Sequence, residues 1–433
     1  MKTSIRYPHF VISLSLILLS AGMSGAVADD FEQPAIFKAS DVIGDKLLRG
    51  EYHVVDDAVR NDGYLNYYVL RSDYGDWEVT GTALLAVRVR EVEALATLDD
   101  VSKTDVFVKA AADAGIGQLK TVKQFATHPV ESVKGIPSGI GRMFKRYKRQ
   151  ADDAVEATKE FVADDDEDSA HADGDEDGSS TTDVAVELTE GYFGVSSAQR
   201  AWAQELGTDP YSRNETLQAA IKQVAWADRL GRFGMKFASI PEIPGADVIG
   251  EVNDVVWSKD PYELEDLNRA RLAATGADDE LIEAYLESPY YSPTQLTYLT
   301  AALTEMDGVT GRDGILRQAL IADTEAEVGF FVKSVTMLAW YHLNKKPIVE
   351  VLTEVVVPRG VAEDGTAVLL FAADYVFWTD TVATAADSYA ALRGDDEDRV
   401  LELWLLGGMS ERTASELAAR NITVHTDLVE LRE

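Results

Sequence analysis

The sequence predicts a helix-dominated α+β fold, with a small β-containing N-terminal domain and a helical middle domain that merges into a C-terminal α+β part. Three observations support this expectation. Residues 41–100 contain short aromatic and β-branched runs between turn signals. Residues 195–345 carry apolar side chains at steps of three and four, which is the period of a helix. Residues 347–433 mix the two patterns.

Length and composition limit the classes of protein to consider. A chain of 433 residues is long enough for about three domains. It holds 75 acidic and 40 basic residues, a net charge of −35, and no cysteine. The lack of cysteine excludes disulfides, thiol nucleophiles and cysteine-ligated metal centres. The negative charge argues against general binding of nucleic acid, because it repels phosphate. The acid excess fits a saline exterior, where charges are screened, or it serves solubility alone.

The first 28 residues have the pattern of a secretory signal peptide. Two basic residues precede an apolar run from Phe10 to Met23, and small residues follow, ending in Ala26-Val27-Ala28. The run is shorter than the roughly 20 residues that a membrane-spanning helix needs. We therefore expect export with cleavage after Ala28, to the periplasm or, as the alternative, to the extracellular medium. An uncleaved signal anchor or a buried helix is the competing interpretation.

The N-terminal domain is expected over residues 29–129. Turn signals at 61–63 and 73–76 separate three runs rich in aromatic and β-branched residues, which predicts a three-stranded meander: 52–55, 64–70 and 77–89. The end of the third run, residues 83–98, fits a helix equally well. Residues 99–124 are predicted to be helical, with a break at residues 115–117.

Residues 130–162 are predicted to form a basic amphipathic helix after a glycine-rich loop. From residue 120 to 149 there are eight Lys or Arg and one Glu, a net charge of +7; from 150 to 190 there are sixteen Asp or Glu and one Lys, a net charge of −15. A helix N-terminus binds anions, and clustered basic side chains bind anionic membranes. We predict an anion- or lipid-binding surface made of Ser138, Gly139, Gly141, Arg142, Lys145, Arg146, Lys148 and Arg149. The alternative is a helix that packs on the N-terminal domain with its charges facing the acidic chain.

Residues 163–190 are predicted to be a disordered acidic linker, because they hold too few apolar residues to order themselves. Within this tract, Asp173, Asp175 and Asp177 match the first half of an EF-hand loop, but Val184 stands where the last ligand should be. We therefore expect weak association with Ca²⁺, and we predict no metal site and no cofactor. The tract is also a candidate to fold back over the basic helix and mask it.

The helical domain is expected over residues 191–346. Asp260-Pro261-Tyr262-Glu263 and Ser292-Pro293-Thr294-Gln295 each place a capping side chain before a proline and an acid or amide two residues further on, which predicts helix starts. Apolar stripes follow these starts, and the short linkers favour antiparallel neighbours.

The C-terminal part, residues 347–433, is predicted to alternate strands with helices. Strands are expected at 348–357, 367–371, 400–406 and 422–425, and helices at 379–392 and 410–420. We leave open whether these strands share one sheet with residues 51–90.

Two groups of aromatic and acidic residues are candidates for ligand binding. Tyr290 and Tyr291 lie between two prolines, and Trp378 is flanked by Asp374 and Asp380. Exported sugar-binding proteins use such sets, because rings cover the apolar sugar faces and carboxylates accept hydrogen bonds from hydroxyls. The alternative is ordinary packing beside a turn.

Complete catalytic motifs are absent from the sequence. No two histidines have a zinc-binding spacing, and the G-x-S-x-G motif of serine hydrolases does not occur. His342 lies on an apolar helix stripe and is expected to be a hydrogen-bonded core histidine.

The expected function is that of an exported, soluble cell-envelope protein with a binding or scaffolding role. Its partner would be another envelope protein or an anionic membrane surface. One alternative is a periplasmic hydrolase with an Asp/Glu-based site that acts on glycans. The other is a peripheral membrane protein that binds anionic lipid through residues 136–155.

Overall fold

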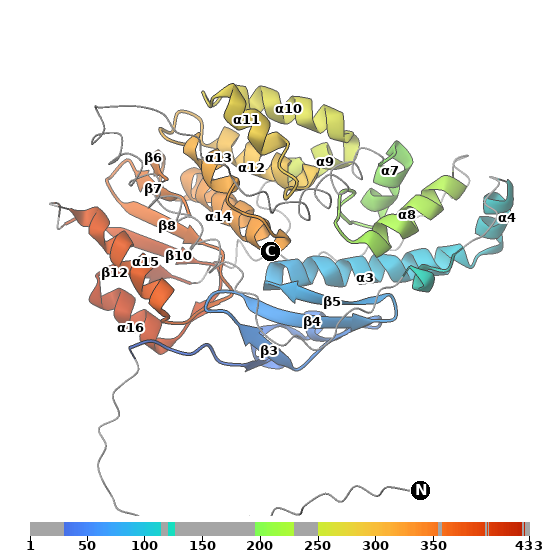
Figure 1. Ribbon diagram of the computed structural model, residues 1–433, viewed down its shortest axis with the longest axis horizontal. Helices are drawn as coiled ribbons and strands as arrows, with labels where there is room; N and C mark the ends of the chain where they lie inside the picture. Colours follow the sequence, from blue (N-terminus) through green and yellow to red (C-terminus); the bar gives the residue numbers. More distant parts are fainter. Residues whose placement is uncertain are drawn as a thin grey trace, which may run out of the picture.

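The computed structural model describes residues 30–113, 120–125, 195–228, 250–353, 357–394, 396, 398–426 and 428. The predicted signal peptide, basic helix and acidic linker lie outside these residues. The fold is α+β and dominated by helices, as predicted (Figure 1). No helix in the described ranges combines the length and the apolar character needed to cross a membrane.

The N-terminal sheet is antiparallel and built around one central strand. β4 pairs along its length with β5 on one side, and with β2 and β3 in succession on the other. β1 extends the sheet beyond β3. The strands are β1 (Phe37–Lys38), β2 (His53–Val55), β3 (Ala58–Asn61), β4 (Asn66–Ser72) and β5 (Gly75–Thr80), and two short helices, α1 (Ala39–Val42) and α2 (Asp45–Leu48), lie between β1 and β2.

The third predicted strand, residues 77–89, is wrong in its second half. β5 ends at Thr80, and helix α3 (Thr82–Ser102) begins two residues later. Gly81 makes this change of direction at a φ of 92°, which a residue with a side chain rarely adopts. The helix that the sequence offered as the alternative for residues 83–98 is therefore confirmed.

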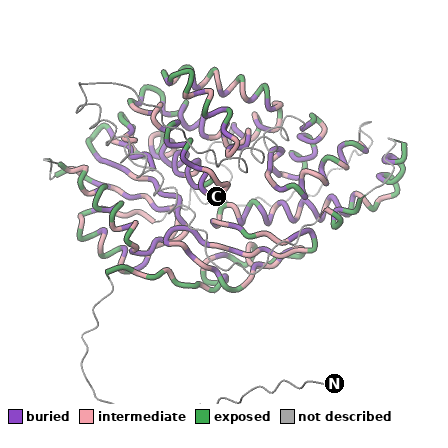
Figure 2. Tube along the Cα trace, viewed as in Figure 1, coloured by how far each residue is buried: buried purple, intermediate pink, exposed green. Residues whose placement is uncertain are grey.

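Helix α3 packs on the N-terminal sheet and carries a second layer of helices. Leu85, Leu95 and Leu98 on α3 are completely buried, and Figure 2 shows burial along most of this helix. The remaining described elements of this part are α4 (Asp105–Asp113), a short 3-10 turn (Val122–Gln124), α7 (Ser197–Glu205) and α8 (Glu215–Ala227). The loop that joins α7 to α8 turns back toward α3.

The middle of the chain is helical, and the predicted helix starts are confirmed. The side chain of Asp260 accepts a hydrogen bond from the Glu263 backbone N–H at 2.9 Å, and Glu263 accepts one in return. Ser292 and Gln295 make the same reciprocal pair. The helices are α9 (Gly250–Ser258), α10 (Pro261–Ala273), α11 (Asp279–Leu286), α12 (Pro293–Glu305), α13 (Gly314–Ala319) and α14 (Glu325–Asn344).

The C-terminal sheet has five strands in the order β12-β10-β8-β7-β6. β8, β10 and β12 are parallel and are joined by helices α15 and α16, while β6 and β7 continue the sheet antiparallel. The elements are β6 (Ile348–Leu352), β7 (Arg359–Ala362), β8 (Ala367–Phe371), β9 (Tyr375–Val376), α15 (Asp380–Ala390), a 3-10 turn (Ala391–Arg393), β10 (Leu401–Leu405), β11 (Gly408–Met409), α16 (Glu411–Ala419) and β12 (Ile422–His425).

Helices cover both faces of this C-terminal sheet, as parallel strands require. In Figure 1, α14 lies on one face, and α15 and α16 lie on the other. The sheet is separate from the N-terminal one, so the two predicted sets of strands do not share a sheet.

One carboxylate joins the C-terminal sheet to the start of α3. The side chain of Asp374, just after β8, accepts hydrogen bonds from the backbone N–H groups of Asn66 at 2.9 Å and Thr82 at 3.1 Å. An acid at a helix N-terminus satisfies free N–H groups and the helix dipole. Asp374 is thus an N-terminal cap for α3, supplied by a residue 292 positions away in sequence.

Candidate functional site

A pocket of about 380 Å³ lies where the parts of the fold meet. Its walls are formed by α3, the loop 207–213 between α7 and α8, the starts of α12 and α14, and α9. Ala372, Asp374 and Leu406 close it on the side of the C-terminal sheet, just beyond the carboxyl ends of β8 and β10. The carboxyl ends of parallel strands are a common place for ligand sites in α/β sheets.

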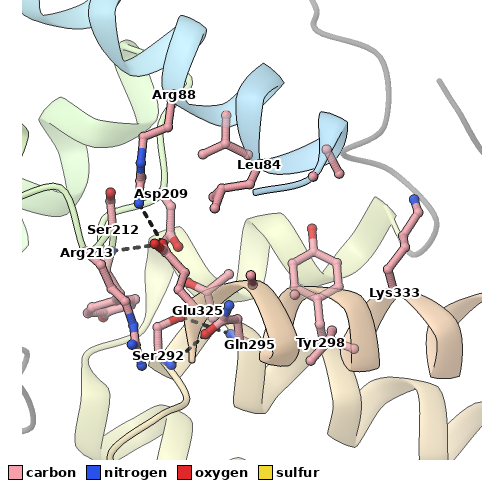
Figure 3. A pocket seen from close by; sticks show the side chains of 18 of the residues that line it. Leu84, Arg88, Asp209, Ser212, Arg213, Ser292, Gln295, Tyr298, Glu325 and Lys333 are labelled. Carbon is pink, nitrogen blue, oxygen red and sulfur yellow. Dashed lines mark hydrogen bonds and ion pairs between the residues drawn. The ribbon is translucent and has the colours of Figure 1, made fainter. Parts of the chain in front are cut away.

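A buried cluster of charges forms one end of the pocket (Figure 3). The guanidinium of Arg88 donates to Glu91 at 2.7 Å and to Glu325 at 2.6 Å. Glu91 also accepts hydrogen bonds from the hydroxyl of Ser212 and, at 2.9 Å, from the side-chain amide of Asn214. Arg88 and Glu91 are only 6% and 1% exposed. Because water does not reach them, their charges are stabilised by each other and by these hydrogen-bond partners.

Arg88 is held in its charged form by its two acids. Burial alone would lower the pKa of the guanidinium, but the charges and hydrogen bonds of Glu91 and Glu325 raise it above its ordinary value. Glu325 differs from Glu91 because its side chain is 30% exposed and lines the pocket. Its Oε1 accepts from Arg88, while its Oε2 has no hydrogen-bond partner in the described part of the chain.

Asp209 is a second carboxylate in the same pocket with one oxygen hydrogen-bonded and the other without a partner in the described ranges. Its Oδ1 accepts hydrogen bonds from the hydroxyl of Thr294 at 2.6 Å and from the backbone N–H of Tyr211 at 2.9 Å. Its Oδ2 has no partner among the residues that the structure describes. Burial raises the pKa of Asp209 to about 6, against the lowering effect of those hydrogen bonds, and the negative charge of Glu91 adds to the rise.

Asp374 reaches the pocket from the sheet side, with both carboxylate oxygens already engaged by backbone N–H groups. Burial raises its pKa to about 6 despite these hydrogen bonds. Burial lowers the pKa of Lys333, on α14, to about 8. In Figure 3, Lys333 lies at the end of the pocket opposite Arg88, with Tyr298 between them.

The walls between these ends are largely apolar. They include Leu84, Val87, Tyr298 and Phe330, of which Val87 is 44% exposed. Gly329 lies in the interior of α14 and also lines the pocket. A Cβ added at Gly329 would meet no atom within 4 Å, so this position opens onto free space.

The carboxylates of Asp209 and Glu325 can accept hydrogen bonds from a ligand, and Asp209 can also exchange a proton with it. Two carboxylate oxygens are free to accept from a ligand, and the raised pKa of Asp209 allows it to be protonated or ionised near neutral pH. Among the described residues, no three His, Asp or Glu side chains are grouped so as to hold a metal ion.

The predicted ligand-binding aromatics do not form a site together. Tyr291 and Trp378 are each 3% exposed and belong to the core. The hydroxyl of Tyr291 donates to the carbonyl of Ala319 at 2.9 Å, and Arg420 lies 4.7 Å from the ring centre of Trp378. Tyr290 packs, half-buried, against the same core, and Asp380 is exposed in the first turn of α15. Of the five residues, the pocket includes Asp374.

The predicted anion- and lipid-binding residues lie outside the described part of the chain: Ser138, Gly139, Gly141, Arg142, Lys145, Arg146, Lys148 and Arg149. The partial calcium loop at 173–184 lies outside it as well. His342 is hydrogen-bonded, as expected, because its Nδ1 accepts from the backbone N–H of Ile348 at 2.9 Å, but it is half-buried and does not belong to the core.

A second group of aromatic rings, around Trp404, is satisfied by its own members. His425 stacks on Trp404 at 4.3 Å, and Trp340 meets it edge-on at 6.0 Å. The ammonium of Lys345 lies 4.9 Å from the Trp340 ring centre and 5.8 Å from that of Trp404. The indole N–H of Trp404 donates to Glu402 at 2.9 Å. The rings of this group therefore contact one another rather than lining a pocket.

Comparison of the chain with protein-family models, with curated proteins and with solved structures finds no match.

Proposed function

We propose that this protein binds a small polar ligand in the pocket between α3, α12 and α14, and that it does so as an exported protein of the cell envelope. One observation carries the proposal. Asp209 and Glu325 line a pocket of about 380 Å³, and in each carboxylate one oxygen is engaged by the protein while the other is free. The volume falls within the range of small-molecule sites, which is about 300–1,000 Å³. Export rests on the signal-peptide pattern of the first 28 residues.

The fixed positions of these carboxylates favour a binding role. Arg88 holds Glu325, and Thr294 holds Asp209, before any ligand arrives. Binding then costs less free energy, because the side chains that contact the ligand are already ordered. The open position at Gly329 supports the same conclusion, because glycine in a helix interior is unfavourable by about 1 kcal/mol relative to alanine.

A second candidate is a hydrolase that uses Asp209 as its general acid. The observation in its favour is the pKa of Asp209, which burial raises to about 6 in a pocket that also contains Glu325. Paired carboxylates with different protonation states hydrolyse glycosidic bonds. Chromogenic glycosides would test this candidate: hydrolysis lost in Asp209→Asn supports it, and a wild-type protein without hydrolysis contradicts it.

The binding proposal is tested by filling the pocket. Thermal unfolding of the wild type is measured with a panel of amino acids, amines, sugars and organic acids, each at millimolar concentration. A ligand present at a hundred times its Kd adds about 2.7 kcal/mol to the free energy of unfolding. We expect at least one panel member to raise the Tm of the wild type and to have no effect on Gly329→Trp.

The control is Gly44→Trp, which makes the same substitution at another position where an added Cβ meets no atom within 4 Å. Gly44 precedes α2 and does not line the pocket. This variant should keep the full ligand response. A panel without effect on the wild type, or a response that persists in Gly329→Trp, would refute the proposal.

A further inference from the structure

We infer that the ligand of this pocket carries a positively charged amino group, which pairs with the free oxygens of Asp209 and Glu325, and an apolar body, which packs between α3 and α14. The inference rests on the proposed binding function and specifies its chemistry. It follows from the charge balance at one end of the pocket, from the two free acceptors and from the apolar walls.

The cluster around Arg88 at this end of the pocket contains more acids than bases. Arg88 is the cation that binds both Glu91 and Glu325, and Asp209 has no basic side chain among its hydrogen-bond partners. Within this cluster of Arg88, Glu91, Glu325 and Asp209, one positive charge stands against three negative ones when all four groups are ionised; Arg90 and Arg213 also line the pocket, but neither is ion-paired with Asp209 or Glu325 in the described ranges. A like-charged ligand would be repelled and a cation attracted, and this Coulomb term grows as water is excluded from the pocket.

The two free acceptors require a donor. Asp209 Oδ2 and Glu325 Oε2 have no hydrogen-bond partner in the described ranges, and an ionised carboxylate oxygen can only accept. Figure 3 shows Asp209 beside the ion pair of Arg88 and Glu325. An ammonium group has three donors and one positive charge, so it satisfies both oxygens and reduces the charge imbalance. A hydroxyl group satisfies the acceptors but leaves the imbalance unchanged.

The other basic residues of the pocket do not take this place. Arg213 directs its Nη2 to the carbonyl oxygen of Pro289 at 3.2 Å. Lys333 lies at the opposite end of the pocket in Figure 3. Arg90 lines the pocket near Gly207, where its guanidinium lies 3.5 Å from the position of an added Cβ. None of the three makes an ion pair with Asp209 or Glu325 within the part of the chain that is described.

The apolar walls of the pocket determine what kind of body the amino group of the ligand is attached to. Leu84 and Val87 on α3, Gly329 and Phe330 on α14, and Tyr298 on α12 line this space. An apolar or aromatic body attached to the amine would bury its surface here at about 25 cal/mol per Å². The expected class of ligand is therefore an alkyl or arylalkyl amine.

Binding of an ammonium group should depend on pH, because the pKa of Asp209 is raised to about 6. A bound ammonium favours the ionised form of this carboxylate and lowers its pKa, so binding at acidic pH must displace a proton. Binding should therefore weaken as the pH falls below about 6. The other charged side chains that line the pocket are Arg88, Arg90, Glu91, Arg213, Glu325, Lys333 and Asp374. Burial raises the pKa of Asp374 to about 6 as well, so the comparison with Asp209→Asn assigns the pH effect to Asp209. Protonation of Lys333 below about pH 8 precedes this window, so it does not change within it.

The test uses three probes with one shared body: 2-phenylethylamine, 2-phenylethanol and phenylacetate. Their dissociation constants are measured by isothermal titration calorimetry on the full chain at pH 7.5 and pH 5. We expect the amine to bind at least about tenfold more tightly than the alcohol at pH 7.5, and phenylacetate to bind least. The advantage of the amine should shrink at pH 5.

Variants assign the effect to the two carboxylates. Asp209→Asn and Glu325→Gln keep the shape and the engaged oxygen of each side chain, and each should remove most of the amine's advantage over the alcohol. Asp279→Asn and Glu305→Gln, exposed acids away from the pocket, are the matched controls and should leave it intact. Thermal unfolding checks that each variant folds. If a pocket variant does not fold, the comparison of probes and pH values on the wild type decides.

Other outcomes overturn the inference and separate it from the proposed function. Equal binding of the amine and the alcohol, both lost in Gly329→Trp, refutes the cationic ligand and leaves the pocket as a binding site. Preferred binding of phenylacetate does the same. An amine preference that survives both Asp209→Asn and Glu325→Gln places the cation elsewhere and also refutes the inference. If no probe binds, the cationic ligand is refuted. The proposed binding function is then decided separately by thermal unfolding with the panel of amino acids, amines, sugars and organic acids.

Discussion

Replacing Gly329 by alanine is expected to stabilise the protein, although Gly329 lines the pocket. Gly329 is the fifth residue of α14, which runs from Glu325 to Asn344. A Cβ at this position meets no atom within 4 Å, so no steric cost offsets the gain in helix propensity. That gain is about 1 kcal/mol, and for a chain of this length it should raise the Tm by about 2 °C.

The comparison with Gly360 shows that the effect depends on the surroundings. Gly360 lies in β7, and an added Cβ there would stand 2.8 Å from Ile348 Cδ1, 3.0 Å from Leu338 Cδ1 and 3.1 Å from Val368 Cγ1. Overpacking of a core costs about 1–3 kcal/mol. Gly360→Ala should therefore lower the Tm, whereas Gly329→Ala should raise it.

Urea unfolding followed by circular dichroism measures both variants. The midpoint should move up for Gly329→Ala and down for Gly360→Ala, at an unchanged slope. A lower or unchanged midpoint for Gly329→Ala would refute the argument, because it would mean that this position does not open onto free space. If the midpoint rises as expected, the natural glycine sacrifices stability to keep the pocket open.

Three further substitutions test the contacts around the pocket. Asp374→Ala leaves two backbone N–H groups without an acceptor and should lower the free energy of unfolding by about 2 kcal/mol; a loss under about 0.5 kcal/mol would exclude the capping role. Arg88→Met leaves the buried carboxylate of Glu91 without its ion-pair partner and should lower the free energy of unfolding, measured in urea, by about 3–5 kcal/mol. An unchanged free energy of unfolding would contradict the dependence of Glu91 on Arg88. Burial lowers the pKa of His53 below its ordinary value of 6.5, so its stability contribution is complete above pH 6.5 and is lost as the pH falls toward the folded-state value. The stability difference between wild type and His53→Gln should therefore shrink from pH 7.5 to pH 5, and a constant difference would be inconsistent with this assignment.

The starts of helices could be predicted because they depend on a few consecutive residues. Asp260 and Ser292 each cap the helix that the sequence assigned to them. A capping side chain bonds to a backbone N–H three residues ahead, so the whole interaction lies within four positions of the chain. No distant contact is needed to identify it.

The boundary between β5 and α3 could not be predicted in the same way. The residues on both sides of Gly81 are apolar or β-branched, and they fit a long strand as well as a strand followed by a helix. The helix begins at Thr82 because Gly81 allows the turn and Asp374 accepts the free N–H of Thr82. Asp374 was selected from the sequence for its neighbours Trp378 and Asp380, and its capping partner lies 292 positions away.

The pocket itself was not visible in the sequence, because segments far apart in the chain, from residue 65 to residue 406, line it. One signal was present: Arg88 and Glu91 stand three residues apart in the apolar run that became α3. Charges inside such a run are buried when the run is a helix packed on two sides, and buried charges require partners. Their partner Glu325, however, resembles any acid in the first turn of a helix. Its role follows only from the packing of α14 against α3.

Helix α3 is held in place by the same charged groups that line the pocket. Asp374 binds its first residue, Arg88 joins its second turn to Glu325 on α14, and Glu91 joins the following turn to the loop before α8. A cation bound to Glu325 and Asp209 would add a partner to this network. The free energy of binding should therefore stabilise α3, α14 and the loop together, and ligand should raise the Tm of the whole chain in a single transition. A ligand that protected only one of these elements from hydrogen exchange would show that the network does not couple them.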